Sequence, residues 1–274
     1  MVKDRGTMYT NCGNHPVCTP AAQTTNKGFI KLNTVLTMEI KGFIDISLVD
    51  WDGEISSVIF LAGCNLRCPF CYNVNLVLHP ENLPTIPFEQ IEDRLKKSRG
   101  WVDGVVILGG EPTIHSDLLG LCEKIKEIGF LVKLDTNGTN PAMIKELIHK
   151  KLVDYIAVDI KAPLTVEKYS KVCGVNVENL IGKIEETVGI LLENEVEYEF
   201  RTTVVSGLHD ERDIEKICQR IKGCRKYVIQ NYKGDVETID PKFNGESFSE
   251  EKMKTFLTIA KNIISNSTLR GVQT

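Results

Sequence analysis

Three cysteines lie within eight residues of one another near the end of the first quarter of this chain. Cys64, Cys68 and Cys71 follow the spacing C-x3-C-x2-C, directly after the apolar run 58–62, which predicts a buried strand. Iron–sulfur clusters are held by cysteine thiolates, normally four for a cubane. Three close cysteines without an obvious fourth favour a cluster with one open iron, because a catalytic metal keeps an open position.

Two other kinds of site could use these thiols. A structural zinc site usually has two C-x2-C pairs or a His pair at fixed spacing, and neither is present, although His79 could supply a fourth ligand. A disulfide framework is disfavoured, because the nine cysteines are an odd count and nothing marks the chain as secreted. The scattered thiols of Cys122, Cys173, Cys218 and Cys224 are predicted to pack as small apolar side chains.

The composition narrows the class of protein. The 274 residues are 42% hydrophobic and 26% charged, which suits one large α/β domain as well as two small ones. The net charge of −4 and the lack of a long basic run argue against a nucleic-acid partner. No apolar segment approaches the roughly 18 residues that span a bilayer, and no signal-peptide core is visible. We expect a soluble protein of the reducing cytoplasm, with no membrane partner.

The first residues differ in composition from the rest. Residues 1–34 are rich in Thr, Asn, Gly and Pro, so we expect residues 1–41 to form an irregular extension and 42–274 to form one domain. Cys12, His15 and Cys18 lie close together there and could in principle bind a second metal. Their spacing matches no firm ligand pattern, which favours incidental thiols.

Strand and helix patterns alternate along the remaining sequence. Strand-like alternation in 35–50 precedes six predicted strands, at 55–62, 104–108, 130–134, 155–158, 197–205 and 227–230. Helices are predicted at 87–97, 116–128, from 140, at 177–194, at 209–222 and after Ser249. This order predicts a parallel sheet with right-handed crossovers. A dinucleotide fold is disfavoured, because no G-x-G-x-x-G follows the first strand.

Polar residues gather where the predicted strands end. Gly109, Gly110 and Glu111 follow the second strand, Asp135 ends the third, and Asp159 with Lys161 follows the fourth. In barrel-like α/β folds the carboxyl ends of the strands converge on one pocket. Short motifs far apart in the sequence are therefore predicted to form a single site.

The cysteine motif and the Gly-Gly-Glu sequence together resemble the radical S-adenosylmethionine (SAM) superfamily. Further segments, at 135–138 (Asp-Thr-Asn-Gly), 158–163 (Val-Asp-Ile-Lys-Ala-Pro) and 200–205 (Phe-Arg-Thr-Thr-Val-Val), look like the activating enzymes of glycyl-radical proteins. Within these, the similarity is greatest to the activators of anaerobic ribonucleoside-triphosphate reductase, and it covers roughly residues 42–245. The resemblance implies an α/β fold, a partial (β/α)6 TIM-like barrel of parallel strands that binds a [4Fe-4S] cluster and SAM.

The resemblance also implies a role for each motif. Three irons would be bound by Cys64, Cys68 and Cys71, and the open iron would bind the amino and carboxylate groups of SAM. The Gly109 and Gly110 carbonyls, with the Asp135 and Asp159 carboxylates, would accept hydrogen bonds from the SAM ammonium. Lys161 would face the SAM carboxylate. The other predicted cofactor-binding residues are Phe70 and Tyr72, placed near the adenine, and Glu111, Asn137, Arg201 and Gln230.

Most of these residues also have a structural interpretation. Gly109-Gly110 could be only a tight turn, Glu111 could brace its loop, and Asp159 with Lys161 could form a simple ion pair, since both point to one side of a strand. The sequence departs from the family at Gln230-Asn231, because related pyruvate formate-lyase activators have in that neighbourhood, on the last barrel strand, a His that touches the SAM ribose. It also has Ser206-Gly207 where Pro-Gly is usual, and the 1–41 extension has no counterpart.

The implied reaction begins with one electron from a flavodoxin or ferredoxin. The reduced cluster would cleave SAM to methionine and a 5′-deoxyadenosyl radical, which would remove hydrogen from a glycine Cα of the partner enzyme, making the protein a radical SAM oxidoreductase. The alternatives are activation of a different enzyme such as pyruvate formate-lyase, a radical SAM reaction on a small molecule such as a deazapurine precursor, and a zinc-stabilised binding module.

Overall fold

The computed structural model describes residues 38–234 and 236–272. Cys12, His15 and Cys18, and nearly all of the expected extension 1–41, lie outside the described residues. The domain boundary at residue 42 stays a prediction. None of the helices in the described part of the chain has the length and apolarity that crossing a bilayer requires.

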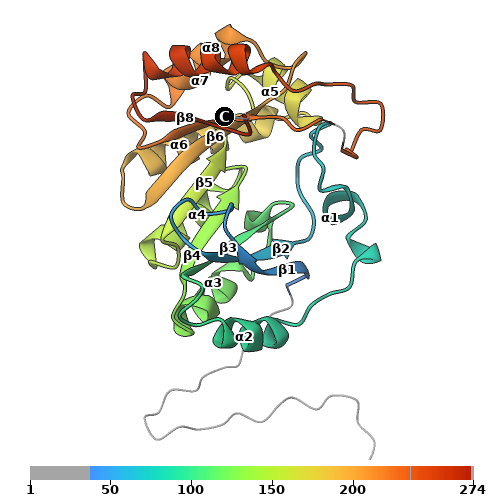
Figure 1. Cartoon of the computed structure of the whole chain (residues 1–274), viewed down its shortest axis with the longest axis vertical. Helices are drawn as coiled ribbons and strands as arrows, with labels where there is room; N and C mark the ends of the chain where they lie inside the picture. The colour runs from blue at the N-terminus through green and yellow to red at the C-terminus, as the bar shows by residue number, and fades with distance from the viewer. Residues whose placement is uncertain (1–37, 235, 273–274) are drawn as a thin grey trace, which may run out of the picture. The chain divides into compact units, whose positions relative to one another are not determined.

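Within residues 38–272 as described, one sheet of eight strands carries the fold, and its strands lie side by side in chain order (Figure 1). The strands are β1 (Ile40–Ser47), β2 (Ser56–Leu61), β3 (Gly104–Gly109), β4 (Leu131–Thr136), β5 (Tyr155–Asp159), β6 (Glu197–Val204), β7 (Tyr227–Asn231) and β8 (Ser267–Arg270). β1 runs antiparallel to β2, and every later neighbour is parallel. The six predicted parallel strands are confirmed as β2–β7, whereas β8 was not predicted. Among the described residues no strand pairing joins β8 to β1, so the sheet stays open.

Helices connect successive parallel strands. The longer helices are α2 (Phe88–Lys97), α3 (Leu118–Glu127), α4 (Pro141–His149), α5 (Val166–Cys173), α6 (Glu178–Leu192), α7 (Glu211–Arg220) and α8 (Glu250–Lys261), and the short ones are α1 (Val74–Leu78), η1 (Pro80–Asn82) and η2 (Pro112–Ile114). Two predicted caps are confirmed, since the side chains of Asn140 and Ser249 accept from the first-turn amides of α4 and α8.

Two helix predictions need correction, and one helix was missed. The helix expected from Ser116 begins at Leu118, because Asp117 and not Ser116 occupies its N-cap position. The helix expected from His209 begins at Glu211, where Asp210 and Asp213 form a reciprocal capping box. Helix α5 was not predicted at all.

The two faces of the sheet have different chemistry. Alternate residues such as Ile107, Leu134 and Phe200 belong to the main apolar core with the helices. The opposite face carries Val58 and Val106 on β2 and β3, which form a separate small apolar cluster. On β4–β6 the same inner face carries charged side chains, namely Lys133, Asp135, Asp159, Glu199 and Arg201. The inner face of the sheet is therefore apolar on β2 and β3 and charged on β4–β6.

The turn between β1 and β2 reaches across this inner face. Trp51 is buried against Val58 and Val106, and its ring centroid lies 5.9 Å from that of Tyr155. The next residue, Asp52, accepts hydrogen bonds from Lys226 at 2.8 Å and from Arg270 of β8 at 3.1 Å. Ion pairs thus link the first hairpin to the last strand, although the sheet itself does not close.

Candidate active site

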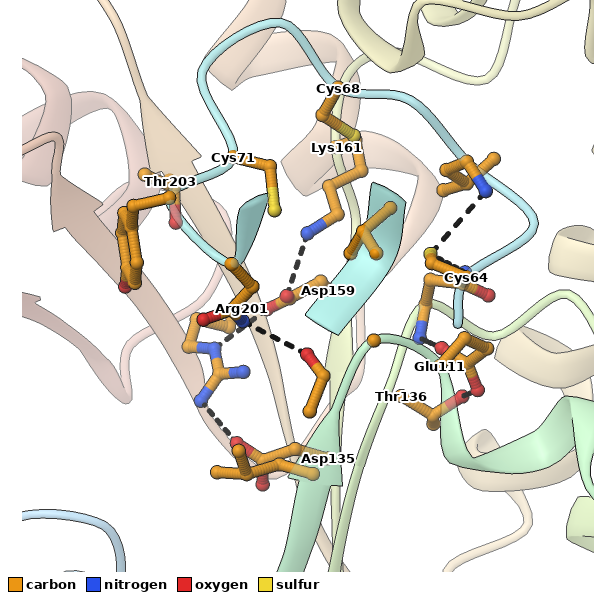
Figure 2. Close-up of a pocket in the computed structure, with 18 of the residues that line it drawn as sticks. Cys64, Cys68, Cys71, Glu111, Asp135, Thr136, Asp159, Lys161, Arg201 and Thr203 are labelled. Carbon is orange, nitrogen blue, oxygen red and sulfur yellow. Dashed lines mark hydrogen bonds and ion pairs between the residues drawn. The ribbon is translucent and has the colours of Figure 1, made fainter. Parts of the chain in front are cut away.

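One cavity of about 440 Å³ lies at the carboxyl ends of the strands, within the size range of small-molecule sites. Every residue that the sequence predicted for the site lines it: Cys64, Cys68, Phe70, Cys71, Tyr72, Gly109, Gly110, Glu111, Asp135, Asn137, Asp159, Lys161, Arg201 and Gln230. Figure 2 shows how loops and strands far apart in the chain bring these side chains together. The predicted convergence of the strand ends is therefore confirmed, whereas the contact of each residue with a cofactor stays a prediction.

The cysteine loop presents three thiols without forming a site for a single ion. Cys68 is buried and the other two are partly buried. In the described part of the chain, no three His, Cys, Asp or Glu side chains surround one ion position. His79 does not line the cavity and lies instead 3.5 Å from Glu81. A mononuclear zinc site therefore has no geometric support, whereas a cluster takes each thiolate on a separate iron.

Backbone contacts fix this loop to the end of β3. A Cβ on Gly110 would lie 1.6 Å from the Gly63 carbonyl oxygen, and one on Gly109, whose φ is +130°, would lie 2.3 Å from that of Leu61. The Glu111 amide donates to the Gly63 oxygen at 2.8 Å, and the Gly109 oxygen accepts from Asn73 at 2.9 Å. Glycine is thus required at both positions because the backbone of the cysteine loop lies so close to the end of β3. The sequence had instead suggested a close contact with a ligand.

Glu111 is almost fully buried and its carboxylate already has partners. One oxygen accepts from the Thr113 amide and from the hydroxyls of Thr113 and Thr136, and the other accepts from the Asn137 amide at 2.7 Å. These bonds match the bracing interpretation. A direct contact of Glu111 with a cofactor would have to be added to them, and it stays a prediction.

A chain of ion pairs forms the charged wall of the cavity (Figure 2). Arg201 donates to Asp159 at 2.7 Å and to Asp135 at 3.0 Å, and Lys161 Nζ lies 2.8 Å from Asp159. Burial alone would raise the pKa of Asp159, but the charges of Arg201 and Lys161 lower it below its ordinary value. Asp159 is therefore ionised, and the predicted ion pair between Asp159 and Lys161 is present.

The profile of the Radical SAM superfamily matches residues 58–221, which include most of β2, the cysteine loop and β3–β6. The chain belongs to the radical SAM superfamily. Members of this superfamily use a [4Fe-4S] cluster and SAM, which are the cofactors predicted from the cysteine spacing and the motifs.

Individual relatives of this radical SAM protein narrow the family. A candidate glycyl-radical enzyme activating enzyme from Methanocaldococcus jannaschii is 36% identical over 235 residues, covering 85% of this chain and 96% of that protein. The radical SAM protein thus falls in the family of glycyl-radical enzyme activating enzymes. A 7-carboxy-7-deazaguanine synthase from Halobacterium salinarum is 33% identical over only 89 residues, 32% of this chain and 33% of that protein.

A solved structure supports the fold. A domain of pyruvate-formate lyase-activating enzyme from Bacteroides vulgatus superposes with a TM-score of 0.50 at 19% identity, covering 62% of this chain and 99% of that domain. At this level of identity the likeness concerns the fold alone. It agrees with the sheet of largely parallel strands described above.

The residues of the radical SAM site fit both cofactors. Three thiols on one loop suit a cluster with an open iron, and the Leu66 amide, which donates to Cys64 Sγ at 3.4 Å, would stabilise the thiolate. Asp135 Oδ1 is buried without a hydrogen-bond partner, although Lys133 Nζ lies 3.3 Å away. This oxygen is an acceptor that an ammonium group in the cavity could satisfy.

Aromatic and amide side chains complete the cavity of the radical SAM site. Phe70 is buried, and its ring contacts those of Tyr232 and Phe243 at centroid distances of 6.2 Å. Tyr72 also lines the cavity and is 56% exposed, so part of its side chain is accessible to a ligand or to solvent. Gln230 also lines the cavity, in agreement with its predicted place at the end of β7.

Several lining or supporting residues were missed by the sequence analysis. Thr203 lies two residues beyond Arg201 on β6, so the period of a strand could have indicated it. Arg270 also lines the cavity, but its strand was not predicted. Asn73 was within the cysteine segment, yet nothing in its sequence context indicated a bond to the Gly109 oxygen.

The role of Gly110 can be tested by substitution. We expect Gly110→Ala to prevent stable cluster loading, because its Cβ would overlap the Gly63 oxygen and push the cysteine loop aside. Overpacking of this kind costs about 1–3 kcal/mol or more. The measurement is iron content together with thermal unfolding. Gly182→Ala is the matched control, since its Cβ meets nothing within 4 Å; normal loading of Gly110→Ala would contradict the assignment.

His209 contacts the backbone of Lys161, and the sequence analysis did not identify it as a supporting residue. Its Nδ1 accepts from the Val205 amide at 3.1 Å, and its Nε2 lies 2.9 Å from the Lys161 carbonyl oxygen. Burial lowers the pKa of His209 below the ordinary value of 6.5. The folded protein therefore holds this ring neutral, with one nitrogen accepting and the other donating.

The neutral His209 makes stability depend on pH. Because its pKa is lower in the folded state, the unfolded chain binds the proton first, so the contribution is complete above about pH 6.5 and is lost as the pH falls. We expect the free energy of unfolding to decrease from about pH 6.5 to pH 5 in chemical denaturation. His209→Asn should flatten this slope, and an equal slope in both proteins would refute the assignment.

Proposed function

We propose that this radical SAM activating enzyme generates the glycyl radical of an anaerobic ribonucleoside-triphosphate reductase. The observation that carries the proposal is the convergence of the three cysteines, the Gly-Gly-Glu loop and the ion-pair chain on one cavity. The similarity to a candidate glycyl-radical enzyme activating enzyme, which covers 85% of this chain, supports a protein substrate. The choice of reductase rests on the sequence motifs at 135–138, 158–163 and 200–205.

Binding of the cofactors would use the two walls of the cavity. Cys64, Cys68 and Cys71 would hold the cluster, and the charged wall would hold the amino-acid part of SAM, with Asp135 facing the ammonium and Lys161 the carboxylate. When bound and supplied with one electron, this pair of cofactors yields methionine, 5′-deoxyadenosine and a glycine from which one Cα hydrogen atom has been removed. The cofactors supply this chemistry, and the protein contributes by binding them and positioning the reacting groups.

The apolar side of the cavity would keep water from the reacting carbon. Phe60 and Leu108 from the ends of β2 and β3 line it, together with Val77 and Ile239. An apolar wall excludes solvent that would compete for a reactive species.

The electron would come from a flavodoxin or ferredoxin in the cytoplasm. The described cysteines are all free thiols, which agrees with a reducing compartment.

The test is formation of a glycyl radical. Reconstituted protein, reduced and supplied with SAM and the reductase of the same genome, should give a glycyl radical signal in electron paramagnetic resonance. Pyruvate formate-lyase in place of the reductase should give none. SAM cleavage without any protein radical would instead favour a small-molecule substrate, and a signal on pyruvate formate-lyase alone would reassign the partner.

A further inference from the structure

The asparagine of the Asp-Thr-Asn-Gly segment makes hydrogen bonds to the cysteine loop that neither motif indicates by itself. Asn137 Oδ1 accepts from the amide and from the hydroxyl of Thr139, at 3.1 and 2.7 Å. With the amide oxygen held there, the Nδ2 group, which can only donate, faces the other way. It donates to Asn65 Oδ1 at 2.8 Å, and Asn65 directly follows Cys64 in the cysteine loop.

Asn65 closes these bonds into a ring. Its Nδ2 group donates to the Thr139 hydroxyl at 2.8 Å, and that hydroxyl in turn donates to Asn137 Oδ1. Each of the three side chains therefore donates once and accepts once around the ring. The Thr139 amide sets the direction of the ring, because it can only donate to an oxygen, so the orientation of both asparagine amides follows from the hydrogen bonds.

The loop that carries Asn137 is held from two further sides. The Asn137 amide donates to the buried carboxylate of Glu111 at 2.7 Å, and Thr187 on α6 donates to the Gly138 oxygen at 2.8 Å. Asn65, by contrast, lies on an exposed part of the cysteine loop. The ring thus ties an exposed segment to a loop whose own position is well determined.

The ring lies against the first of the three thiols. Cys64 Sγ is 4.0 Å from Asn137 Nδ2 and 4.0 Å from Asn65 Oδ1. Figure 2 shows this thiol on the side of the cavity where Glu111 also lies. Asn137 lines the cavity, whereas Asn65 and Thr139 do not. These two residues are therefore placed to hold the Cys64 segment without touching a ligand in the cavity.

We propose that Asn65, Thr139 and Asn137 are positioning residues for the cluster, whose ring holds the Cys64 thiolate where it binds iron. Partners that orient a metal ligand from outside contribute to retention of the metal. Asn137 was predicted to contact a cofactor directly, whereas the ring gives it a role that is exerted through Cys64. This inference rests on the ligand role of Cys64 in the proposed function.

The experiment measures how fast the loaded protein releases iron to a chelator in the absence of oxygen. Thr139→Val removes the hydroxyl with little change of shape and opens the ring, and Asn65→Ala removes both bonds made by the cysteine loop. We expect each variant to release iron about 10-fold faster than wild type, the lower end of the range for outer partners of metal ligands. Because either change opens the same ring, the double variant should be no faster than the faster single variant.

Two further threonine variants separate the ring from packing. Thr139→Ser keeps the hydroxyl and should stay within about twofold of wild type. Thr187→Val removes another buried hydroxyl bonded to the same loop but leaves the ring closed, so it should also stay within about twofold. Release from Thr139→Ser or from Thr187→Val as fast as from Thr139→Val would overturn the proposal.

Asn65→Ala covers the case in which Thr139→Val fails to fold, because Asn65 is exposed. A wild-type release rate in Asn65→Ala would overturn the proposal, whereas a variant that folds by circular dichroism but retains no iron gives the expected result in its strongest form. Iron release requires neither SAM nor the reductase nor a glycyl radical. Failure of this inference is therefore distinguishable from failure of the proposed function.

Discussion

Alanine in place of Cys64, Cys68 or Cys71 should leave a folded protein that no longer cleaves SAM. Each thiol lines the cavity from the same loop, and a cluster that loses one of three protein ligands is not retained. We expect activity to fall by more than about 100-fold, since even outer-shell partners of metal ligands contribute 10- to 100-fold. The measurements are iron and sulfide content, visible absorbance and methionine release after reduction.

The controls for this prediction use a cysteine away from the cavity. Cys224→Ala removes a buried thiol that does not line the site, and it should keep full iron content. Circular dichroism of the cluster-free proteins should show that all variants fold. If any one of the three variants retained four irons and SAM cleavage, the assigned ligand set would be wrong.

Of the substitutions described, Arg201→Ala should cause the largest decrease in the free energy of unfolding. Arg201 bonds both Asp135 and Asp159, and all three side chains are at most 20% exposed. Its removal leaves two carboxylates without their shared partner in a buried wall, and breaking buried pairs costs about 3–5 kcal/mol. Chemical denaturation of the cluster-free protein measures the change without contributions from cofactor binding.

An exposed pair of the same chemistry provides the comparison. Arg94 pairs with Asp45 on the outer face of β1, where the two side chains are 43% and 57% exposed. Arg94→Ala should cost no more than about 1 kcal/mol. Equal effects of the two substitutions would show that the Arg201 network adds nothing beyond a surface ion pair.

The sequence predicted the parallel strands and the site because both depend on local signals. Apolar runs such as 104–108 are typical of strands buried in a parallel sheet, and the motifs directly after them had to meet at one edge. Helix α5 escaped because its pattern is short and follows Pro163, and β8 has only four residues. Such elements form when tertiary packing supports them, which local periodicity does not show.

The sequence predicted which residues form the site better than it predicted the contacts between them. Gly109 and Gly110 were identified, but their partners Leu61 and Gly63 are nearly fifty residues earlier in the chain. In the same way, nothing near His209 in the sequence indicates that its ring holds the carbonyl of Lys161. Long-range approach of backbone to backbone leaves no periodic signal, so the sequence identifies the residues of the site and the structure identifies their partners.

The bonds from Asp52 to Lys226 and Arg270 give the last strand a role that its length conceals. Arg270 lines the cavity and also tethers the first hairpin, 218 residues away in the chain. Deleting residues from 267 onward would remove the Arg270 contact and leave Lys226 as the partner of Asp52, while the pairing of β2–β7 would be untouched.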